Sequence, residues 1–161
     1  MGSMATATES RAPSFVRVFN PIARRILNIG PLLGPNALIT VQGRKSGLPR
    51  TTPVALVEID GKRWVIGTFG EVNWVRNLRT VGRATLSAGN RADEVTASEL
   101  MGEARTAFFR DVLGPYVRKL RVGPALLAIL GAGDILKDPA AAAAKRPVFE
   151  LRPAAITGRK T

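Results

Sequence analysis

The sequence predicts an α+β fold in which a small, mostly antiparallel β-barrel is flanked by helices. Three observations support this prediction. Five or six short segments of the chain have the residue pattern of strands, and two pairs of neighbours are joined by tight-turn dipeptides, Asp60-Gly61 and Gly89-Asn90. Segments of helical periodicity lie between these strands and at the ends of the chain. Nothing resembles GxGxxG or GxxxxGK[ST], so the sequence supports neither dinucleotide-binding nor P-loop chemistry.

The predicted strands follow one another in the middle of the chain, and one more closes the fold. Apolar and β-branched residues bounded by turn residues identify each of them. The predicted strands are Ala37–Gln42, Thr52–Ile59, Lys62–Thr68, Arg83–Ala88, Arg91–Leu100 and the closing segment "PVFELRP".

Helical periodicity appears in four further places. In "FGEVNWVRNLRT" the residues Trp74, Asn77 and Leu78 share one helical face. A helix is predicted over roughly Glu103–Leu113 and is expected to break at Gly114-Pro115. The pattern over Val117–Ile135 is mostly helical, and "DPAAAAAK" reads as a short capped helix.

The N-terminal region contains a basic amphipathic segment, residues 14–29, whose apolar residues share one helical face opposite Arg17, Arg24 and Arg25. Packing on its own domain and contact with an anionic membrane surface are both open for this segment. We expect a disordered tail over residues 1–13, which includes an expression scar ("MGSM"), then one domain over 14–153 and a flexible tail over 154–161.

Two residue types are absent from the whole sequence, cysteine and histidine. Without cysteine there is no thiol nucleophile, disulfide, iron–sulfur cluster or common zinc site, so we expect no metal. Without histidine the usual general base near neutral pH is missing as well. An enzyme with this composition is expected to use an organic cofactor that carries its own reactivity.

The charge balance is strongly basic, with 24 Lys and Arg against 12 Asp and Glu and a net charge of +12. Between Ser10 and Val57 there are seven basic residues and no acidic one. Such a field attracts nucleic acid, an acidic membrane surface or a polyanionic small molecule. No signal peptide is evident, which favours the cytoplasm, with membrane association as an open addition.

The basic residues concentrate in the loop "QGRKSGLPR", residues 42–50, between two predicted strands. Gly43 and Gly47 bracket Arg44-Lys45-Ser46 and permit a tight turn whose backbone N–H groups converge. Arginine can bind phosphate or carboxylate oxygens bidentately. By spacing alone, the loop is either a solvated hairpin or an anion site.

The segment "TVQGRKSGLPRTTPVALVEIDGKRWVIGTFG…NWVRNL" resembles the deazaflavin-dependent nitroreductase family. The similarity covers about residues 37–82 and rests on GRKSG-x-PR-x-x-P followed by a hairpin, a glycine and W-x-x-N. It implies a split β-barrel of the FMN-binding type that uses reduced coenzyme F420, a deazaflavin with a phosphodiester and a glutamate tail. The resemblance thus favours the anion site.

The resemblance also implies a set of cofactor-binding residues. Those of the basic loop would hold the phosphate and the tail, those around Gly67 would lie along the ring, and two helical residues would close the pocket. The set is Arg44, Lys45, Ser46, Gly47, Arg50, Thr51, Thr52, Pro53, Gly67, Thr68, Phe69, Trp74 and Asn77. Core packing is the alternative role for Trp74.

The implied activity is hydride transfer from reduced F420 to an electron-poor organic acceptor such as a quinone or an enone, which requires neither histidine nor cysteine. The sequence departs from the family at Gly70, at Ala55 and in having Tyr116 as its only tyrosine. These differences disfavour nitroimidazole-type activity and leave Tyr116 as a weak catalytic candidate. Alternatives are an FMN-using or lipid-storing split barrel and a charge-driven nucleic-acid or membrane binder. Few aromatic residues accompany the arginines, so we expect no nucleic-acid binding.

Overall fold

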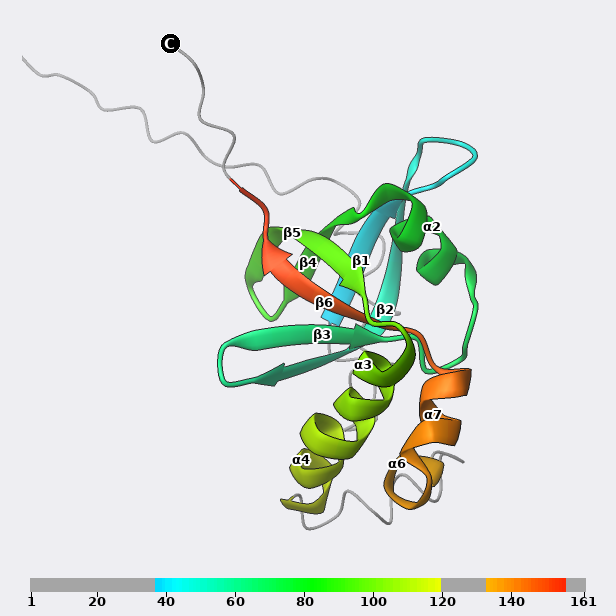
Figure 1. The fold of residues 1–161 in the computed structure, drawn as a ribbon. Coiled ribbons are helices and arrows are strands. Elements are labelled where there is room, and N and C mark those ends of the chain that lie inside the picture. The colour runs from blue at the N-terminus through cyan, green and yellow to red at the C-terminus, as the bar shows by residue number, and fades with distance from the viewer. Residues whose placement is uncertain (1–36, 120–132, 156–161) are drawn as a thin grey trace, which may run out of the picture.

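Six antiparallel strands close into a barrel in the order β1-β2-β3-β6-β5-β4 (Figure 1). Each neighbouring pair is antiparallel, so the predicted barrel of α+β class is confirmed. The strands are β1 (Ala37–Gln42), β2 (Pro49–Ile59), β3 (Lys62–Ile66), β4 (Arg83–Ala88), β5 (Arg91–Glu99) and β6 (Val148–Pro153).

The structure, a computed structural model, describes residues 37–119 and 133–155. The predictions for the tail 1–13, for the amphipathic segment 14–29 and for most of Val117–Ile135 lie outside this part of the chain. Among the described residues, β1 and β4 have the predicted bounds. Strand β2 begins three residues earlier than predicted, at Pro49, because Pro49 and Arg50 already pair with Gln42 and Val41.

Strand β2 is the longest strand of the barrel at 11 residues, and it pairs with two neighbours in succession. Its first half pairs with β1 and its second half with β3. The turn between β2 and β3 is formed by Asp60 and Gly61, whose φ angles of 51° and 76° are those of a two-residue hairpin turn. Strand β3 ends at Ile66, two residues before the predicted end. The Gly67 N–H still donates to the Pro147 carbonyl at 2.7 Å, in register with the Ile66–Val148 pair, but Pro147 has no N–H to donate in return.

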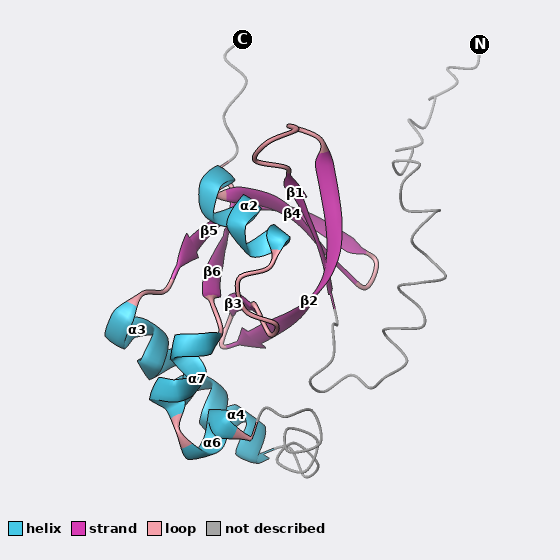
Figure 2. Ribbon diagram, turned by 90° about the vertical axis from the view of Figure 1, so that its right-hand side faces the viewer, coloured by secondary structure: helices cyan, strands magenta, loops and turns pink. Residues whose placement is uncertain are grey.

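The hydrophobic residues form two clusters, one inside the barrel and one beneath it. The inner cluster combines strand residues such as Ile39, Val65 and Val95 with residues of α2 (Asn73–Val81). Figure 2 shows α2 lying across one open end of the barrel. Trp74, Val75 and Leu78 contribute to this core, so α2 is positioned by apolar packing.

The second cluster joins the outer surface of the sheet to a helical layer at the lower end of the barrel in Figure 2. The helices are α3 (Gly102–Ala107), η1 (Phe108–Leu113), α4 (Gly114–Lys119), α6 (Asp134–Lys137) and α7 (Pro139–Lys145). The predicted cap of α7 is confirmed, since Asp138 accepts from the Ala141 N–H at 3.0 Å. No helix of the described residues is long and apolar enough to cross a membrane.

The predicted break at Gly114-Pro115 is wrong, because the chain stays helical from α3 through η1 to α4. Residues Phe108–Leu113 are π-helical, and the Gly114 N–H donates to the Phe109 carbonyl five residues earlier. A proline inside an α-helix lacks an N–H and clashes with the carbonyl four residues before it. The wider π turn directly before Pro115 relieves this conflict without ending the helix.

Candidate functional site

A cavity of about 790 Å³ lies where the β1–β2 hairpin meets the N-terminal end of α2. Among the residues that the structure describes, its lining combines three cationic side chains with hydroxyl and amide groups and contains no carboxylate. The lining residues are Thr40, Val41, Gly43, Arg44, Lys45, Ser46, Pro49, Arg50, Thr51, Thr52, Asn73, Trp74 and Asn77. Such a donor set suits a large anion.

The hairpin loop is closed by its own backbone. The Gly43 N–H donates to the Leu48 carbonyl, and the Gly47 N–H donates to the Gly43 carbonyl, both at 2.8 Å. Gly47 has a φ of 69°, a conformation that favours glycine. The Leu48 N–H also donates to the Ser46 Oγ at 3.2 Å. These bonds hold Arg44 and Lys45 on a short, defined turn, and Arg50 follows at the start of β2.

Arg44 is held in place by α2. The Asn77 Oδ1 accepts from the Arg44 backbone N–H at 3.2 Å and from the Arg44 Nη1 at 2.8 Å. Asn77 is buried, and only 6% of its surface is exposed. The buried amide therefore links the helix to the loop, and it leaves the remaining guanidinium donors of Arg44 available to an anion.

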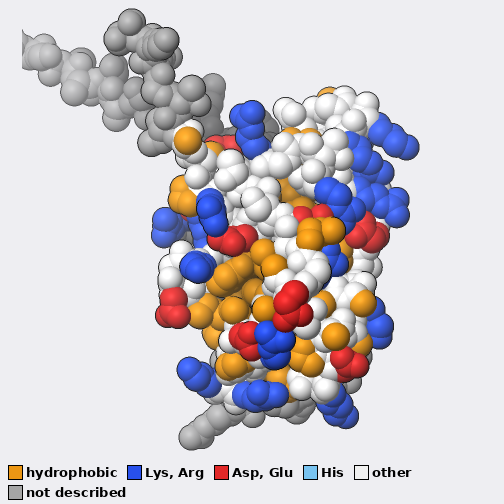
Figure 3. Space-filling model, in the orientation of Figure 1, with side chains coloured by type: hydrophobic (Ala, Val, Ile, Leu, Met, Phe, Trp, Pro, Cys, Tyr) orange, Lys and Arg blue, Asp and Glu red, His pale blue; other side chains and the backbone are white. Residues whose placement is uncertain are grey.

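Lys45 and Arg50 are exposed, and neither forms an ion pair with any carboxylate of residues 37–119 and 133–155. In Figure 3, basic side chains gather at the upper right, over the β1–β2 loop and α2. The described residues also contain no group of three or more acidic side chains that could hold a metal ion. The local field of the cavity is therefore positive.

Most of the sequence-predicted site residues meet at this cavity. Eight of them line it: Arg44, Lys45, Ser46, Arg50, Thr51, Thr52, Trp74 and Asn77. Five predicted residues do not line it: Gly47, Pro53, Gly67, Thr68 and Phe69.

Gly67 has a packing role where the structure places it. A Cβ atom at this position would lie 3.0 Å from the Val75 Cγ2 and 3.2 Å from the Pro147 Cδ, so the loop lies tightly against α2 and the start of β6. Phe69, two residues further on, is 87% exposed. Tyr116, the weak catalytic candidate, lies on α4 in the helical layer and is not part of the cavity lining.

Five lining residues were missed by the sequence reasoning: Thr40, Val41, Gly43, Pro49 and Asn73. The strand register explains two of them. Thr40 lies opposite Thr51 and bonds to it through the two hydroxyls at 2.8 Å, while Val41 lies opposite Arg50. Extending the pairing of β1 with β2 to the end of the hairpin would have identified both from the sequence.

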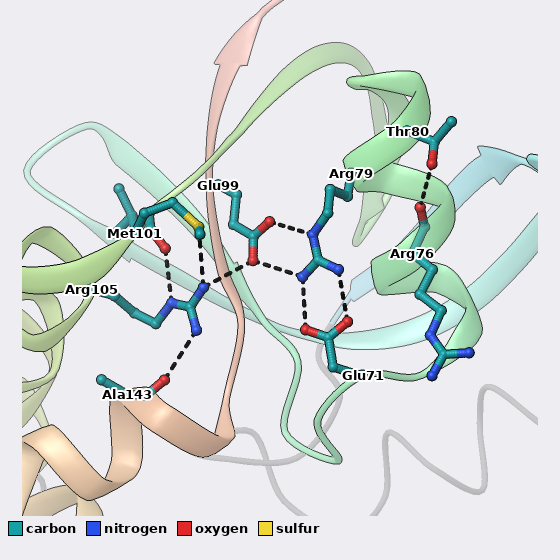
Figure 4. A network of polar contacts seen from close by, with 9 residues as sticks. Glu71, Arg76, Arg79, Thr80, Glu99, Met101, Arg105 and Ala143 are labelled. Atoms are coloured by element: carbon teal, nitrogen blue, oxygen red, sulfur yellow. Dashed lines mark hydrogen bonds and ion pairs between the residues drawn. The ribbon is translucent and has the colours of Figure 1, made fainter.

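On the other flank of α2, four charged residues form a continuous network (Figure 4). Arg79 binds Glu99 through its Nε at 2.6 Å and Glu71 through its Nη1 and Nη2, each at 2.7 Å. Arg105 donates to the same Glu99 at 3.0 Å and to the Leu100 and Ala143 carbonyls. The network connects the loop before α2, helix α2, strand β5 and the helical layer.

The charges of this network reinforce one another. Hydrogen bonds from Arg79 hold the pKa of Glu71 below its usual value, against the opposing effect of desolvation. Hydrogen bonds to Glu99 and then to Glu71 raise the pKa of Arg79. The Glu99 side chain is only 10% exposed, so its two arginine partners are required for its burial.

The sequence model of the F420H2-dependent quinone reductase family matches residues 16–120. The chain belongs to this family. It is therefore an F420H2-dependent oxidoreductase with coenzyme F420 as its cofactor, a small molecule as its hydride acceptor and the predicted split β-barrel as its fold.

Several solved structures are similar to this chain at low sequence identity. An F420-H2 dependent reductase is 23% identical over 73% of this chain and 94% of its own, with a TM-score of 0.49. A structure described as a domain-swapped dimer is 23% identical over 86% and 100%, with a TM-score of 0.48. HutZ, the haem storage protein from Vibrio cholerae, is 12% identical over 84% and 89%, with a TM-score of 0.44. No curated protein sequence matches the chain. Family membership rests on the family model.

Proposed function

We propose that the cavity between the β1–β2 hairpin and α2 binds the phosphate and the glutamate tail of coenzyme F420. The observation that carries this proposal is a lining that contains Arg44, Lys45 and Arg50 and, within the described part of the chain, no carboxylate. Three cations in seven residues provide charge-assisted hydrogen bonds to several anionic oxygens at once. The donor set therefore fits the anionic part of the cofactor.

Each residue has a distinct part in this proposal. Arg44 presents its remaining donors while Asn77 fixes its orientation. Lys45 and Arg50 supply charge from the exposed side of the loop, and Thr52 supplies a hydroxyl from the strand. Because Asn77 holds Arg44 in advance, binding loses less side-chain entropy than it would with a free arginine.

Reduced F420, when bound, supplies a hydride to an electron-poor acceptor, for which we propose a quinone or an enone. The protein's contribution is to bind and orient the cofactor and to exclude water from it. Trp74, whose ring is buried against Phe149 at a centroid distance of 6.2 Å, forms the apolar wall of the cavity. A role of Gly67, Thr68 and Phe69 beside the ring stays a prediction, since the cavity does not include them.

Calorimetric titration with oxidised F420, FMN and duplex DNA tests the proposal. Losing one charge-assisted contact costs about 1.5–3 kcal/mol, or roughly 10- to 150-fold in affinity, so F420 should bind at least about tenfold more tightly than FMN. DNA should bind weakly and without saturation. Equal affinity for the two flavins would contradict the proposal. A panel of quinones and enones, reduced with F420H2, then identifies the acceptor class.

We propose that the proton that accompanies the hydride comes from solvent and that Tyr116 has no part in the reaction. Tyr116 lies on α4 among the helices of the lower layer, and the cavity is at the hairpin end of the barrel (Figure 1). Deleting a true general acid costs about 100-fold or more in turnover. Tyr116→Phe should therefore lose less than about tenfold in steady-state turnover, which is about 1.4 kcal/mol of barrier.

A peripheral membrane contact through residues 14–29 and a cytoplasmic location also stay proposals. The support for the first is the basic and apolar amphipathic pattern of that segment. Co-sedimentation with liposomes, with and without anionic lipid, tests it, and the absence of lipid-dependent pelleting would contradict it.

A further inference from the structure

The arginines of the described residues fall into two groups. Seven form ion pairs with carboxylates: Arg63, Arg79, Arg91, Arg105, Arg110, Arg146 and Arg152. Within residues 37–119 and 133–155, five form none: Arg44, Arg50, Arg76, Arg83 and Arg118. Two of these five, Arg44 and Arg50, line the cavity, which raises the question of what Arg76 does.

Arg76 lies on α2 directly beside the cavity. Residues three apart are neighbours on a helix surface, so Arg76 adjoins Asn73. Asn73 lines the cavity, and Arg76, which is not itself part of the lining, is exposed next to it. Its side chain is long enough to reach over the rim of the cavity from this position.

Within residues 37–119 and 133–155, the Arg76 side chain forms no ion pair, although its charge helps to lower the pKa of the Glu71 carboxyl after the larger effect of Arg79. Figure 4 shows Arg79 extending toward Glu71 and Glu99, while no ion pair joins the Arg76 guanidinium to a carboxylate. Both oxygens of Glu71, the acidic residue closest along the chain, already accept from Arg79. The only contact through Arg76 in that view is its backbone carbonyl, which accepts from Thr80.

We propose that Arg76 binds the distal carboxylates of the F420 glutamate tail and thereby makes the protein favour long-tailed forms of the cofactor. The inference rests on the proposed function, in which the hairpin holds the phosphate and the first part of the tail. Arg76 adds a fourth cation on α2, the helix that adjoins the hairpin. A short tail ends before it reaches this cation, whereas a longer one has carboxylates to place there.

The experiment measures affinity for F420 with a single glutamate and for F420 with four or more. Wild type, Arg76→Ala and Arg76→Lys are compared by calorimetry, with Arg118→Ala as the matched control, since Arg118 is an exposed and unpaired arginine on α4. We expect the wild type to prefer the long tail. Arg76→Ala should lose about two- to fivefold in affinity for the long-tailed form and less than about 1.5-fold for the short one. Arg76→Lys should keep most of the preference, and Arg118→Ala all of it.

An equal loss for both tail lengths in Arg76→Ala, or the same loss in Arg118→Ala, would overturn the inference. So would an unchanged preference in Arg76→Ala. The proposed function fails on a different result, namely the absence of tight F420 binding by the wild type. Unchanged melting temperatures of the four proteins exclude loss of folding as the cause.

Discussion

The two flanks of helix α2 use arginine in opposite ways. On one flank, the hairpin places Arg44, Lys45 and Arg50 around a cavity without a carboxylate. On the other, Arg79 and Arg105 surround Glu99 and leave it only 10% exposed. The flank with uncompensated charge is open to an external anion, and the flank with compensated charge connects elements of the fold.

The difference has a thermodynamic meaning. Cations that lack a partner within the protein repel one another, and an incoming anion relieves this repulsion as it binds. In a compensated network the charges already satisfy one another, so removing one member leaves another uncompensated and costs stability. Arg44 combines both situations in part, because the neutral Asn77 orients it without neutralising it. Substitutions on the two flanks are therefore expected to separate binding from stability.

Substituting Arg44 should have the largest effect. Arg44→Ala is expected to weaken F420 binding by roughly 10- to 150-fold, because it removes a charge-assisted contact of about 1.5–3 kcal/mol. The melting temperature should change little, and titration calorimetry with thermal unfolding measures both quantities. Arg118→Ala is the control for a change of one positive charge. Affinity within twofold of wild type in Arg44→Ala would place the anion site elsewhere.

Substituting Glu99 should give the reverse pattern. Glu99→Gln leaves Arg79 and Arg105 with weaker acceptors at a largely enclosed position, where the Glu99 side chain is 10% exposed, and we expect a loss of about 1–2 kcal/mol in the free energy of unfolding. Glu103→Gln is the control, since Glu103 pairs with Arg110 on the exposed surface and should contribute at most about 0.5 kcal/mol. Denaturant unfolding measures both variants. Equal losses in the two would show that burial of Glu99 adds nothing.

The same contrast explains which residues of the two flanks could be predicted from the sequence. The hairpin cations lie within seven residues of the chain, and turn residues and strand alternation place them, so Arg44, Lys45 and Arg50 were predictable. The network joins Glu71, Arg79, Glu99 and Arg105 from four separate elements. Their proximity depends on the closure of the barrel and on the docking of α2, which no local pattern reveals.

Two predictions considered the properties of a residue alone and not the structure that surrounds it. The break at Gly114-Pro115 was predicted from the Gly-Pro dipeptide, and the π turn before Pro115 removes the conflict. Gly67 was assigned to the ring of the cofactor because of its small size, and the structure shows that the same small size admits Val75 and Pro147. A glycine in a pattern indicates close approach without identifying the atom that approaches.

Raising the salt concentration should weaken F420 binding at the cavity more than it changes the stability contributed by the Glu99 network. Both effects should be smaller than those of Arg44→Ala and Glu99→Gln. The hairpin cations are partly exposed, and the Debye length falls from about 10 Å at 0.1 M to about 3 Å at 1 M salt. Affinity for F420 is therefore expected to weaken by about three- to tenfold over this range. The difference in unfolding free energy between wild type and Glu99→Gln should change far less, because only 10% of the Glu99 side chain is exposed to the solvent. Affinity independent of salt would indicate that apolar contacts of the ring dominate binding.

The smallest effect should come from acid titration of Glu71 at the exposed edge of the network. Arg79 lowers the pKa of the folded-state Glu71 carboxyl from 4.5, so the unfolded chain takes up the proton first as the pH falls. The stabilisation by the Glu71–Arg79 pair is therefore complete above about pH 5.5 and declines as the pH falls through 4.5 toward the folded-state pKa. Both side chains are about half exposed, so solvent screening limits the contribution to less than about 1 kcal/mol.

Glu71→Gln should accordingly lower the melting temperature slightly at pH 7, and the difference from wild type should shrink below pH 4.5. If the difference in melting temperature stayed constant down to pH 3, the charge of Glu71 would not be the source of the stabilisation. The pair would then stabilise α2 through its hydrogen-bond geometry, which glutamine retains in part.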